Sequence, residues 1–220
     1  MTFQSSPCFF MELLHSFLQV FFNLLYHSLA FSYDFISAAV SFGKWKDWVY
    51  SVIPLIEGTS ILELGHGPGH LQHVLRSHGR VFAMDESAQM GKLARHRLGS
   101  SHRLTRALSQ KMPYASGIFD TLISTFPSEY ILDAHTLSEA YRVLRRNGRL
   151  IILLSALAMN PLSRLLFRIT GQSSVGPVES PKSKIMEFLA LQGFKAEVLI
   201  VKVKSGSLLF IVALKENEKC

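Results

Sequence analysis

The chain has 220 residues, of which 48% are hydrophobic and 18% are charged. This length allows one domain with a substantial core, together with a short additional segment. Lys and Arg outnumber Asp and Glu by 23 to 16, which gives a net charge of +7. The surplus favours an anionic partner such as a membrane surface, a nucleic acid or an acidic metabolite, although scattered basic residues also suit a solvated face.

Two cysteines, Cys8 and Cys220, lie far apart in the sequence, and neither has a CxxC partner or a partner at metal-ligand spacing. This pattern does not suit a disulfide framework and favours a reducing, cytoplasmic location. The histidines also lack metal-ligand spacing with acids or cysteines, so no metal site is predicted.

Residues 9–31 are strongly apolar but carry one polar stripe. Its members are spaced three or four apart, as on one side of a helix: Glu12, His15, Gln19, Asn23 and His27. The first Lys is Lys44, so the basic region of a secretory signal is missing. Three interpretations stay open: a helix that packs on the domain or covers the substrate, a helix in a membrane interface, and a membrane span.

From residue 60 onward, apolar runs alternate with helical patterns, which is typical of a parallel α/β sheet. Predicted strands cover residues 60–64, 81–84 (ending at Asp85), 103–105, 120–124 and 149–154. Predicted helices cover the stretch from the first glycine loop to about residue 78, then residues 87–98 and 133–144.

The final part of the sequence differs from this alternation. Residues 194–203 and 207–214 are separated by a short turn and predict a hairpin, so the parallel sheet closes with an antiparallel strand. Residues 170–184 are rich in Gly, Ser and Pro and predict a loop. We expect a doubly wound, mostly parallel seven-stranded α/β domain over residues 51–220, after a helical extension over residues 1–50.

Three glycines, Gly65, Gly67 and Gly69, follow the first predicted strand and precede a helix. Glycines there let the backbone turn sharply and approach a ligand closely. Asp85 comes twenty residues after Gly65, where a doubly wound fold presents an acid to ribose hydroxyls. A nicotinamide fingerprint does not fit, because its third glycine position holds His70, and no Gly-Lys-Ser/Thr phosphate loop is present.

The segment from Glu63 to Gly69 resembles motif I of class I S-adenosylmethionine-dependent methyltransferases, and Asp85 resembles the acid that closes their second strand. Residues 109–114 with 119–122 are similar to the family's segment beside the adenine, and residues 142–150 to its helix-to-strand turn. The resemblance covers residues 59–214 and implies S-adenosyl-L-methionine as the cofactor. It implies the following cofactor contacts: Glu63, Gly65, His66, Gly67, Gly69, Asp85, Glu86, Ser109, Gln110 and Thr125.

Two positions depart from the family pattern. Leu108 stands where an acid usually contacts the adenine amine, so that contact must come from backbone groups or from Gln110. Asn147 replaces the first glycine of the usual turn. The first departure motivates one alternative, a non-catalytic protein that only binds the cofactor.

Residues 33–45 resemble the entry helix of ubiquinone and menaquinone methyltransferases and of bacterial phospholipid N-methyltransferases. The resemblance implies a place for Tyr33 in the substrate pocket, with an aromatic core contact as the alternative. Residues 125–130 follow the fourth strand at the ligand-binding edge of the sheet, so Glu129 and Tyr130 are predicted substrate contacts.

The sequence thus predicts methyl transfer to a small hydrophobic or lipid-like acceptor, with peripheral membrane contact through residues 9–31. Methylation of RNA or protein, motivated by the net charge, is a further alternative. Nucleic acid is the disfavoured partner, because no aromatic and basic RNA-binding pattern is present.

Overall fold

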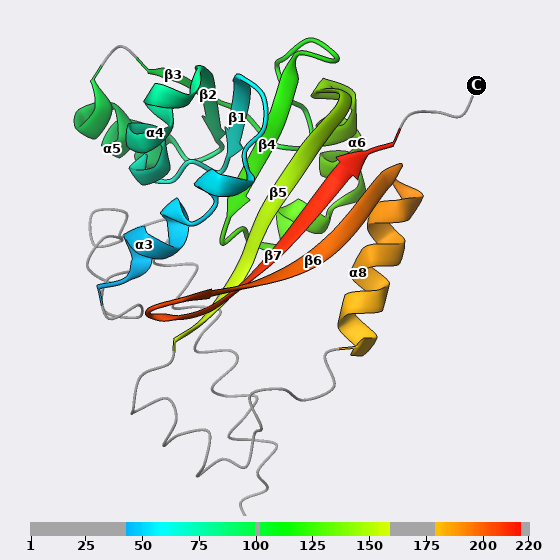
Figure 1. The fold of residues 1–220 in the computed structure, drawn as a ribbon. Helices are drawn as coiled ribbons and strands as arrows, with labels where there is room; N and C mark the ends of the chain where they lie inside the picture. The colour runs from blue at the N-terminus through cyan, green and yellow to red at the C-terminus, as the bar shows by residue number, and fades with distance from the viewer. Residues whose placement is uncertain (1–42, 100–101, 159–178, 217–220) are drawn as a thin grey trace, which may run out of the picture. The chain divides into compact units, whose positions relative to one another are not determined.

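The computed structural model describes residues 43–99, 102–158 and 179–216, and the compact unit that contains the sheet begins at Lys44 (Figure 1). The predicted polar-striped segment 9–31 and Tyr33 lie outside the described residues, as does most of the predicted loop 170–184. Within the part of the chain that is described, no helix combines the length and the apolar character needed to cross a membrane.

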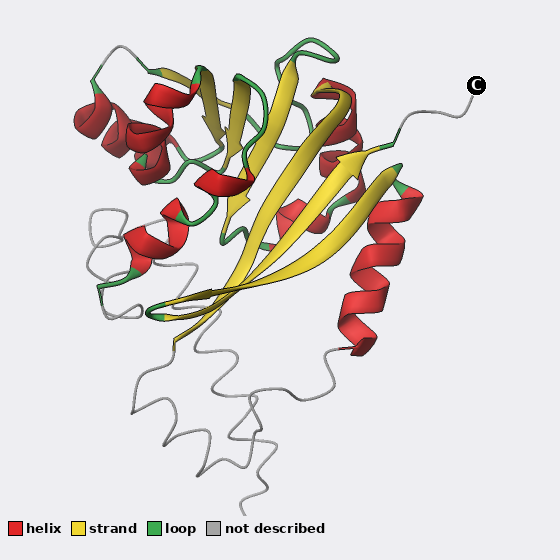
Figure 2. Cartoon of the chain, in the orientation of Figure 1, coloured by secondary structure: helices red, strands yellow, loops and turns green. Residues whose placement is uncertain are grey.

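A seven-stranded sheet forms the centre of the domain (Figure 2). Its strands are β1 (Ser60–Leu64), β2 (Arg80–Asp85), β3 (Arg103–Arg106), β4 (Phe119–Thr125), β5 (Leu144–Ala158), β6 (Phe194–Val203) and β7 (Gly206–Lys215). Their order is β3-β2-β1-β4-β5-β7-β6, with β1 to β5 parallel and β7 antiparallel to both of its neighbours. The predicted doubly wound, mostly parallel sheet with a reversed strand at its end is therefore confirmed.

Helices cover the two faces of this sheet (Figure 1). One face carries α3 (Trp45–Tyr50), α4 (His70–Leu75) and α5 (Ala88–Leu98), and the other carries α6 (Ala134–Val143) and α8 (Glu179–Leu191). Each face has its own apolar core, because parallel strands must be covered on both sides. Two fully buried aromatic side chains, Phe119 and Phe194, lie in the core under α6 and α8.

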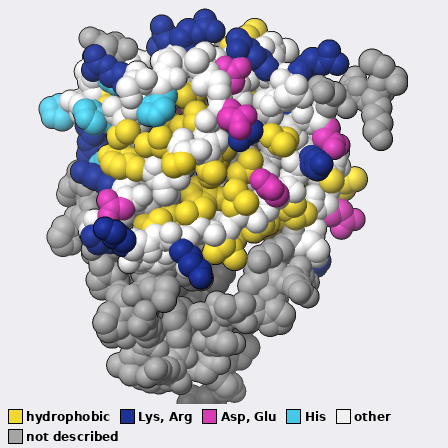
Figure 3. All heavy atoms as spheres, in the orientation of Figure 1, with side chains coloured by type: hydrophobic (Ala, Val, Ile, Leu, Met, Phe, Trp, Pro, Cys, Tyr) yellow, Lys and Arg dark blue, Asp and Glu magenta, His cyan; other side chains and the backbone are white. Residues whose placement is uncertain are grey.

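The described helices leave part of the sheet surface uncovered. In Figure 3, hydrophobic side chains gather on the face toward the viewer, over the region of β5, β7 and β6. Two β6 side chains that pack on the core of this face, Leu199 and Val201, are half-buried. The front of the molecule therefore carries a broad apolar area over β5, β7 and β6.

Two boundaries differ from the sequence-based expectation. The predicted loop 170–184 is wrong from Glu179 onward, because α8 begins there. Pro181 is the third residue of α8, and a proline in the first turn breaks no helical hydrogen bond, so its presence did not mark a loop. The strand predicted over residues 149–154 extends from Leu144 to Ala158, since long pairing with β7 continues it.

Candidate cofactor and active site

Three strand ends meet at one edge of the sheet and supply the candidate site. β1 pairs with β2 on one side and with β4 on the other, and all three strands are parallel. The glycine loop follows β1, Asp85 ends β2 and Thr125 ends β4. Because the strand order reverses direction beside β1, this edge is the crevice where open α/β sheets bind ligands.

The glycine loop leaves β1 in a left-handed conformation. Gly65 has φ +71° and Gly67 has φ +52°, and residues with a Cβ atom rarely adopt this conformation. At Gly67, an added Cβ atom would meet no other heavy atom within 4 Å, so a ligand can approach the backbone closely. Gly69 ends the loop as the N-cap of α4.

Asp85 is held directly against this loop. Its Oδ2 accepts a hydrogen bond of 2.9 Å from the Gly67 amide, and its Oδ1 accepts one of 2.8 Å from the Ser87 amide. Ser87 in turn caps α5, since its hydroxyl accepts a hydrogen bond from the Met90 amide. Asp85 and the glycine loop, both predicted cofactor contacts, are therefore in direct contact, and two backbone donors fix the orientation of the carboxylate.

Glu63 lies in the central strand and is only 2% exposed. Its Oε2 accepts a hydrogen bond of 2.7 Å from the Gln72 amide group on α4. Burial raises the pKa of this carboxyl to about 8, the charge of Asp85 adds to the rise, and the Gln72 hydrogen bond opposes it. At neutral pH the folded protein therefore keeps Glu63 mainly protonated.

His66 is buried within the glycine loop, with 4% exposure. Its Nδ1 lies 2.6 Å from the Gly67 carbonyl oxygen, so the neutral ring donates its proton there. Burial lowers the pKa of His66, although the nearby Asp85 charge acts in the opposite direction. The ring is thus neutral at pH 7.

A small cavity of about 140 Å³ opens beside His66 and Asp85. Its remaining lining comes from α5, β3 and the residue before α5: Ser87, Ala88, Gly91, Lys92, Arg95, Leu104, Thr105 and Arg106. The side chain of Glu86, a predicted cofactor contact, is exposed, and its carbonyl oxygen accepts a hydrogen bond from Arg106.

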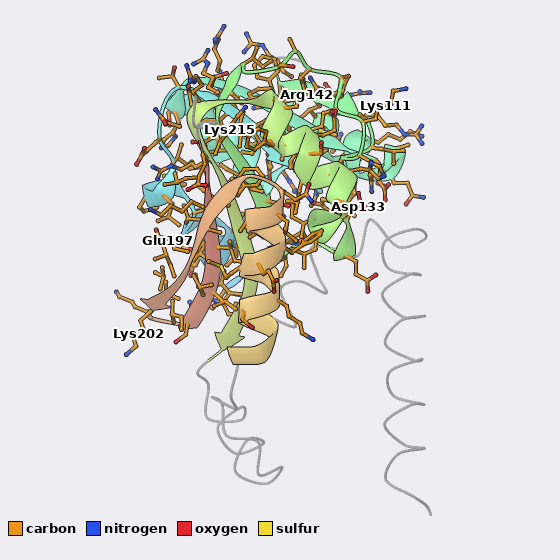
Figure 4. The ribbon with its side chains drawn as sticks, turned by 90° about the vertical axis from the view of Figure 1, so that its right-hand side faces the viewer. Lys111, Asp133, Arg142, Glu197, Lys202 and Lys215 are labelled. Atoms are coloured by element: carbon orange, nitrogen blue, oxygen red, sulfur yellow. The ribbon has the colours of Figure 1, made fainter. Side chains whose placement is uncertain are left out.

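The predicted adenine-side segment is fastened to α6. Arg142 donates hydrogen bonds to the carbonyl oxygens of Met112 and Tyr114, at 3.1 and 2.7 Å. Glu139 pairs with Arg142 at 2.6 Å and also accepts a hydrogen bond of 2.7 Å from the Met112 amide. Figure 4 shows Arg142 on the same side of the molecule as Lys111, which belongs to this segment. The hydrogen bond from Arg142 lowers the pKa of Glu139, against a smaller opposing effect of burial.

The predicted residues of this segment differ in exposure. Ser109 is half-buried, whereas Gln110 is exposed and Leu108 is 54% exposed. The chain leaves β3 at Arg106, opposite Asp85 at the site edge, and the clamp by Arg142 and Glu139 then holds the segment at Met112 and Tyr114. The sequence did not predict this clamp. Arg142 binds backbone carbonyl oxygens about thirty residues earlier in the chain, and such contacts leave no residue pattern.

The predicted substrate contacts lie just after the end of β4. The Tyr130 hydroxyl lies 2.9 Å from Ser124 Oγ and donates to the Leu64 carbonyl oxygen at 3.2 Å. Ser124 also donates to Leu64, at 3.1 Å. Tyr130 therefore contacts the strand end from which the glycine loop starts, while Glu129 is exposed at the beginning of the 3-10 helix Glu129–Leu132.

Two residues that hydrogen-bond to the end of β1, Ser124 and Gln72, were not predicted from the sequence, for different reasons. Ser124 is a buried polar residue within an apolar strand, which is a signal that the sequence offers. Gln72 is the hydrogen-bond partner of Glu63 only because α4 packs over β1, and no sequence spacing indicates that contact. Both residues hold predicted site residues in place.

The residues present fit an adenosyl cofactor with a methionine end. The open backbone at Gly67 allows close approach, and the fixed carboxylate of Asp85 can accept hydrogen bonds from ribose hydroxyls. The side chains of Glu63 and His66, both uncharged at neutral pH, belong to the end of β1 and to the same loop. A dinucleotide with a pyrophosphate fits less well, since an acid already takes the Gly67 amide.

This sheet order, with a glycine loop after β1 and an acid at the end of β2, is the arrangement of class I, S-adenosylmethionine-dependent methyltransferases. Residues 62–152 match the family model of the methyltransferase domain. The matched segment contains the glycine loop, Asp85 and the whole of β4.

Characterised relatives carry quinone-related names. The chain is 29% identical over 154 residues to the ubiquinone/menaquinone biosynthesis C-methyltransferase of Klebsiella pneumoniae, covering 64% of this chain and 61% of the relative. It is 29% identical over 136 residues to the demethylmenaquinone methyltransferase of Thermotoga maritima, covering 59% of each chain. The match thus spans about three fifths of the relatives' length.

Solved structures share the fold. The YcgJ protein of Bacillus subtilis superposes with a TM-score of 0.57 at 12% identity, over 78% of this chain and 99% of that one. Magnesium protoporphyrin IX methyltransferase of Synechocystis, solved with bound S-adenosylhomocysteine, superposes with a TM-score of 0.53 at 18% identity, over 78% and 83%. These similarities support the architecture alone.

Proposed function

We propose that this protein transfers a methyl group from S-adenosylmethionine to a ring carbon of a small, hydrophobic, quinol-type acceptor. The main support for methyl transfer from this cofactor is the hydrogen bond between the Gly67 amide and Asp85. It joins the glycine loop to the acid that would bind the ribose. The acceptor class is supported by the quinone-related relatives and by the apolar sheet face in Figure 3.

The chain's own residues bind and orient the reactants. Asp85 would hold the ribose hydroxyls, the open backbone at Gly67 would contact the methionine end, and the clamped segment that contains Ser109 would lie beside the adenine. When bound, the cofactor supplies a methyl group on a sulfonium, which is already activated for displacement. Tyr130 and Ser124 would keep the end of β1 in register with the end of β4, where the acceptor enters.

Alignment and exclusion of water then account for most of the acceleration. Holding two reactants in line can lower the barrier by roughly 7–11 kcal/mol in favourable cases. For a quinol, the ring carbon would bond to the methyl carbon while the methyl–sulfur bond breaks and the neutral thioether leaves. The same ring carbon would then lose its proton to a base or to water. Neutral His66 lies within the glycine loop and is buried, so we assign it to the cofactor side of the site.

A transfer assay tests this proposal. The purified chain is incubated with S-adenosylmethionine labelled in its methyl group and with a quinol, a phospholipid, an RNA or a protein extract as acceptor. We expect label in the quinol alone and at least a hundredfold loss of transfer in Asp85→Ala. Asp47→Asn, an exposed change on α3, is the matched control and should keep full transfer. Label in RNA or protein instead would overturn the acceptor class, and no label with any acceptor would support a non-catalytic role.

Peripheral membrane contact through residues 9–31 belongs to the same proposal, because the acceptor class is apolar and the segment combines a wide apolar face with one polar stripe. Sedimentation with phospholipid vesicles tests it. We expect the full chain to sediment with vesicles and Leu18→Asp to remain in the supernatant. Equal sedimentation of both proteins would contradict a role for this segment.

A further inference from the structure

Three aromatic side chains form a cluster at the carboxyl end of β4. Phe126 directly follows this strand, and its ring lies 4.4 Å from the ring of Trp45 at an interplanar angle of 29°, which is a stacked arrangement. Trp48 lies 6.4 Å away from Phe126 in a tilted arrangement. Trp45 and Phe126 are half-buried, whereas Trp48 is 4% exposed and donates a hydrogen bond from Nε1 to Ser205 Oγ at 2.8 Å.

The backbone of Phe126 has an uncommon conformation. Its φ of +49° lies in the left-handed region, where glycine and asparagine are usual and bulky residues are rare. The Phe126 amide donates to the Leu153 carbonyl oxygen at 2.8 Å, so the next strand fixes this turn. Such conformations persist where the surroundings enforce them, and they cluster at functional sites.

The cluster lies next to the glycine loop. Phe126 is two residues after Ser124, whose hydroxyl donates to Leu64, the residue before the loop. Since β1 and β4 are neighbouring strands, the Phe126 turn and the Gly65 turn leave the sheet side by side. An acceptor aligned with a methyl group at this edge therefore meets the aromatic rings on one of its sides.

We propose that Phe126 and Trp45 form the wall on which the flat ring of the acceptor stacks, and that they select a planar phenol or hydroquinone over a saturated or purely aliphatic acceptor. This inference rests on the proposed function and adds its specificity-determining residues. Offset stacking between rings adds attraction beyond the burial of apolar surface, and it requires a flat partner.

Intrinsic fluorescence reports directly on this wall, because the chain has two Trp residues, Trp45 and Trp48, and both belong to the cluster. The full chain is titrated with methoxyhydroquinone, and in parallel with methoxycyclohexanediol, its saturated counterpart. N-acetyltryptophanamide is the reference for light absorbed by the probe. We expect saturable quenching by the aromatic probe alone, most of it lost in Trp45→Phe and most of it kept in Trp48→Phe.

The variant Phe126→Asn removes the ring but keeps a residue that tolerates the left-handed backbone, so the turn should survive. We expect about a tenfold weaker affinity for methoxyhydroquinone and unchanged calorimetric binding of S-adenosylmethionine. Phe126→Tyr should restore ring binding. Equal affinity of wild type and Phe126→Asn, or equal binding of the saturated probe, would overturn the inference.

The two proposals fail separately. If the enzyme methylates a quinol and Phe126→Asn leaves its KM for the quinol unchanged, the aromatic wall is wrong and the proposed function stands. If methoxyhydroquinone quenches Trp45 but no quinol accepts a methyl group, the ring site stands and the proposed acceptor is wrong.

Discussion

The hydroxyl group of Tyr130 lies directly over the backbone of Gly65. A Cβ atom added at Gly65 would come within 2.6 Å of Tyr130 Oη, which is closer than real Cβ atoms approach other atoms. The same hydroxyl donates to Leu64, the residue before the glycine. Tyr130 thus fixes the start of the glycine loop and occupies the space that a side chain there would need.

The first prediction concerns this contact. We expect Gly65→Ala to lower the free energy of unfolding by about 2–3 kcal/mol, because it combines a left-handed backbone with a steric clash. Removing the Tyr130 hydroxyl in Gly65→Ala/Tyr130→Phe should recover part of this loss. Urea unfolding of the four proteins in the cycle measures the coupling, and additive effects would contradict the contact.

A second prediction uses the buried carboxyl of Glu63. Because burial raises its folded pKa to about 8, the folded state holds a proton that the unfolded chain releases near pH 4.5. This contribution to stability is fully present below pH 4.5 and is lost as the pH rises to about 8. At roughly 1.4 kcal/mol per pKa unit, the loss amounts to at most about 5 kcal/mol.

Glu63→Gln is the matched variant, because its amide has the same shape and can still accept the Gln72 hydrogen bond. Urea unfolding at pH 5 and pH 9 should show a decrease for the wild type that is several kcal/mol larger than the decrease for Glu63→Gln. Comparing the two proteins cancels the pH-dependent stability contributed by the other titratable groups. A parallel decrease in both proteins would show that Glu63 titrates normally.

A third prediction concerns the clamp on the adenine-side segment. Arg142→Ala removes the ion pair with Glu139 and the hydrogen bonds to the Met112 and Tyr114 carbonyl oxygens. Both side chains are partly exposed, so we expect a moderate stability loss of about 1–2 kcal/mol. Calorimetry should show an affinity for S-adenosylmethionine that is at least fivefold weaker.

The control for the clamp is Asp133→Ala, which removes the N-cap of the same helix at its other end. A cap of this kind contributes about 1 kcal/mol, so the two variants should have similar stability. Only Arg142→Ala should lose cofactor affinity. Equal affinity in both would mean that the clamp does not shape the cofactor site.

A fourth prediction concerns Asn147, whose φ is +60°. Both Asn147→Gly and Asn147→Ala remove the side-chain amide. The difference between their stabilities therefore measures the cost of the left-handed backbone conformation alone. We expect Asn147→Gly to be more stable by about 1 kcal/mol, because alanine disfavours this conformation. Thermal unfolding measures the difference, and equal stability would show that the turn relaxes in the alanine variant.

The sequence predicted the parallel part of this fold well, because buried parallel strands are continuous apolar runs that glycine and charged residues delimit. Residues 60–64 and the helix that begins after Ser87 match the structure closely. The glycine loop and Asp85 were predicted to contact the same cofactor. The direct Gly67–Asp85 hydrogen bond needed the structure.

Other features depend on packing between distant elements and left no local pattern. The stacking of Trp45 on Phe126 joins residues on α3 and after β4, and Arg142 reaches back to a loop before β4. The helix α8 was missed because Ser and Pro near its start suggested a loop. The predicted contacts of Glu129, Tyr130 and Thr125 with reactants stay predictions, as does the domain boundary at residue 50.

The position of β7 determines when the sheet can be completed during synthesis of the chain. Among the strands that the structure describes, β7 comes last in the chain, yet it inserts between β5 and β6. Until residues 206–215 emerge, β5 presents an unpaired, strongly apolar edge, and β6 has no strand to join. At this stage the exposed edge of β5 is open to pairing with strands of other unfinished chains.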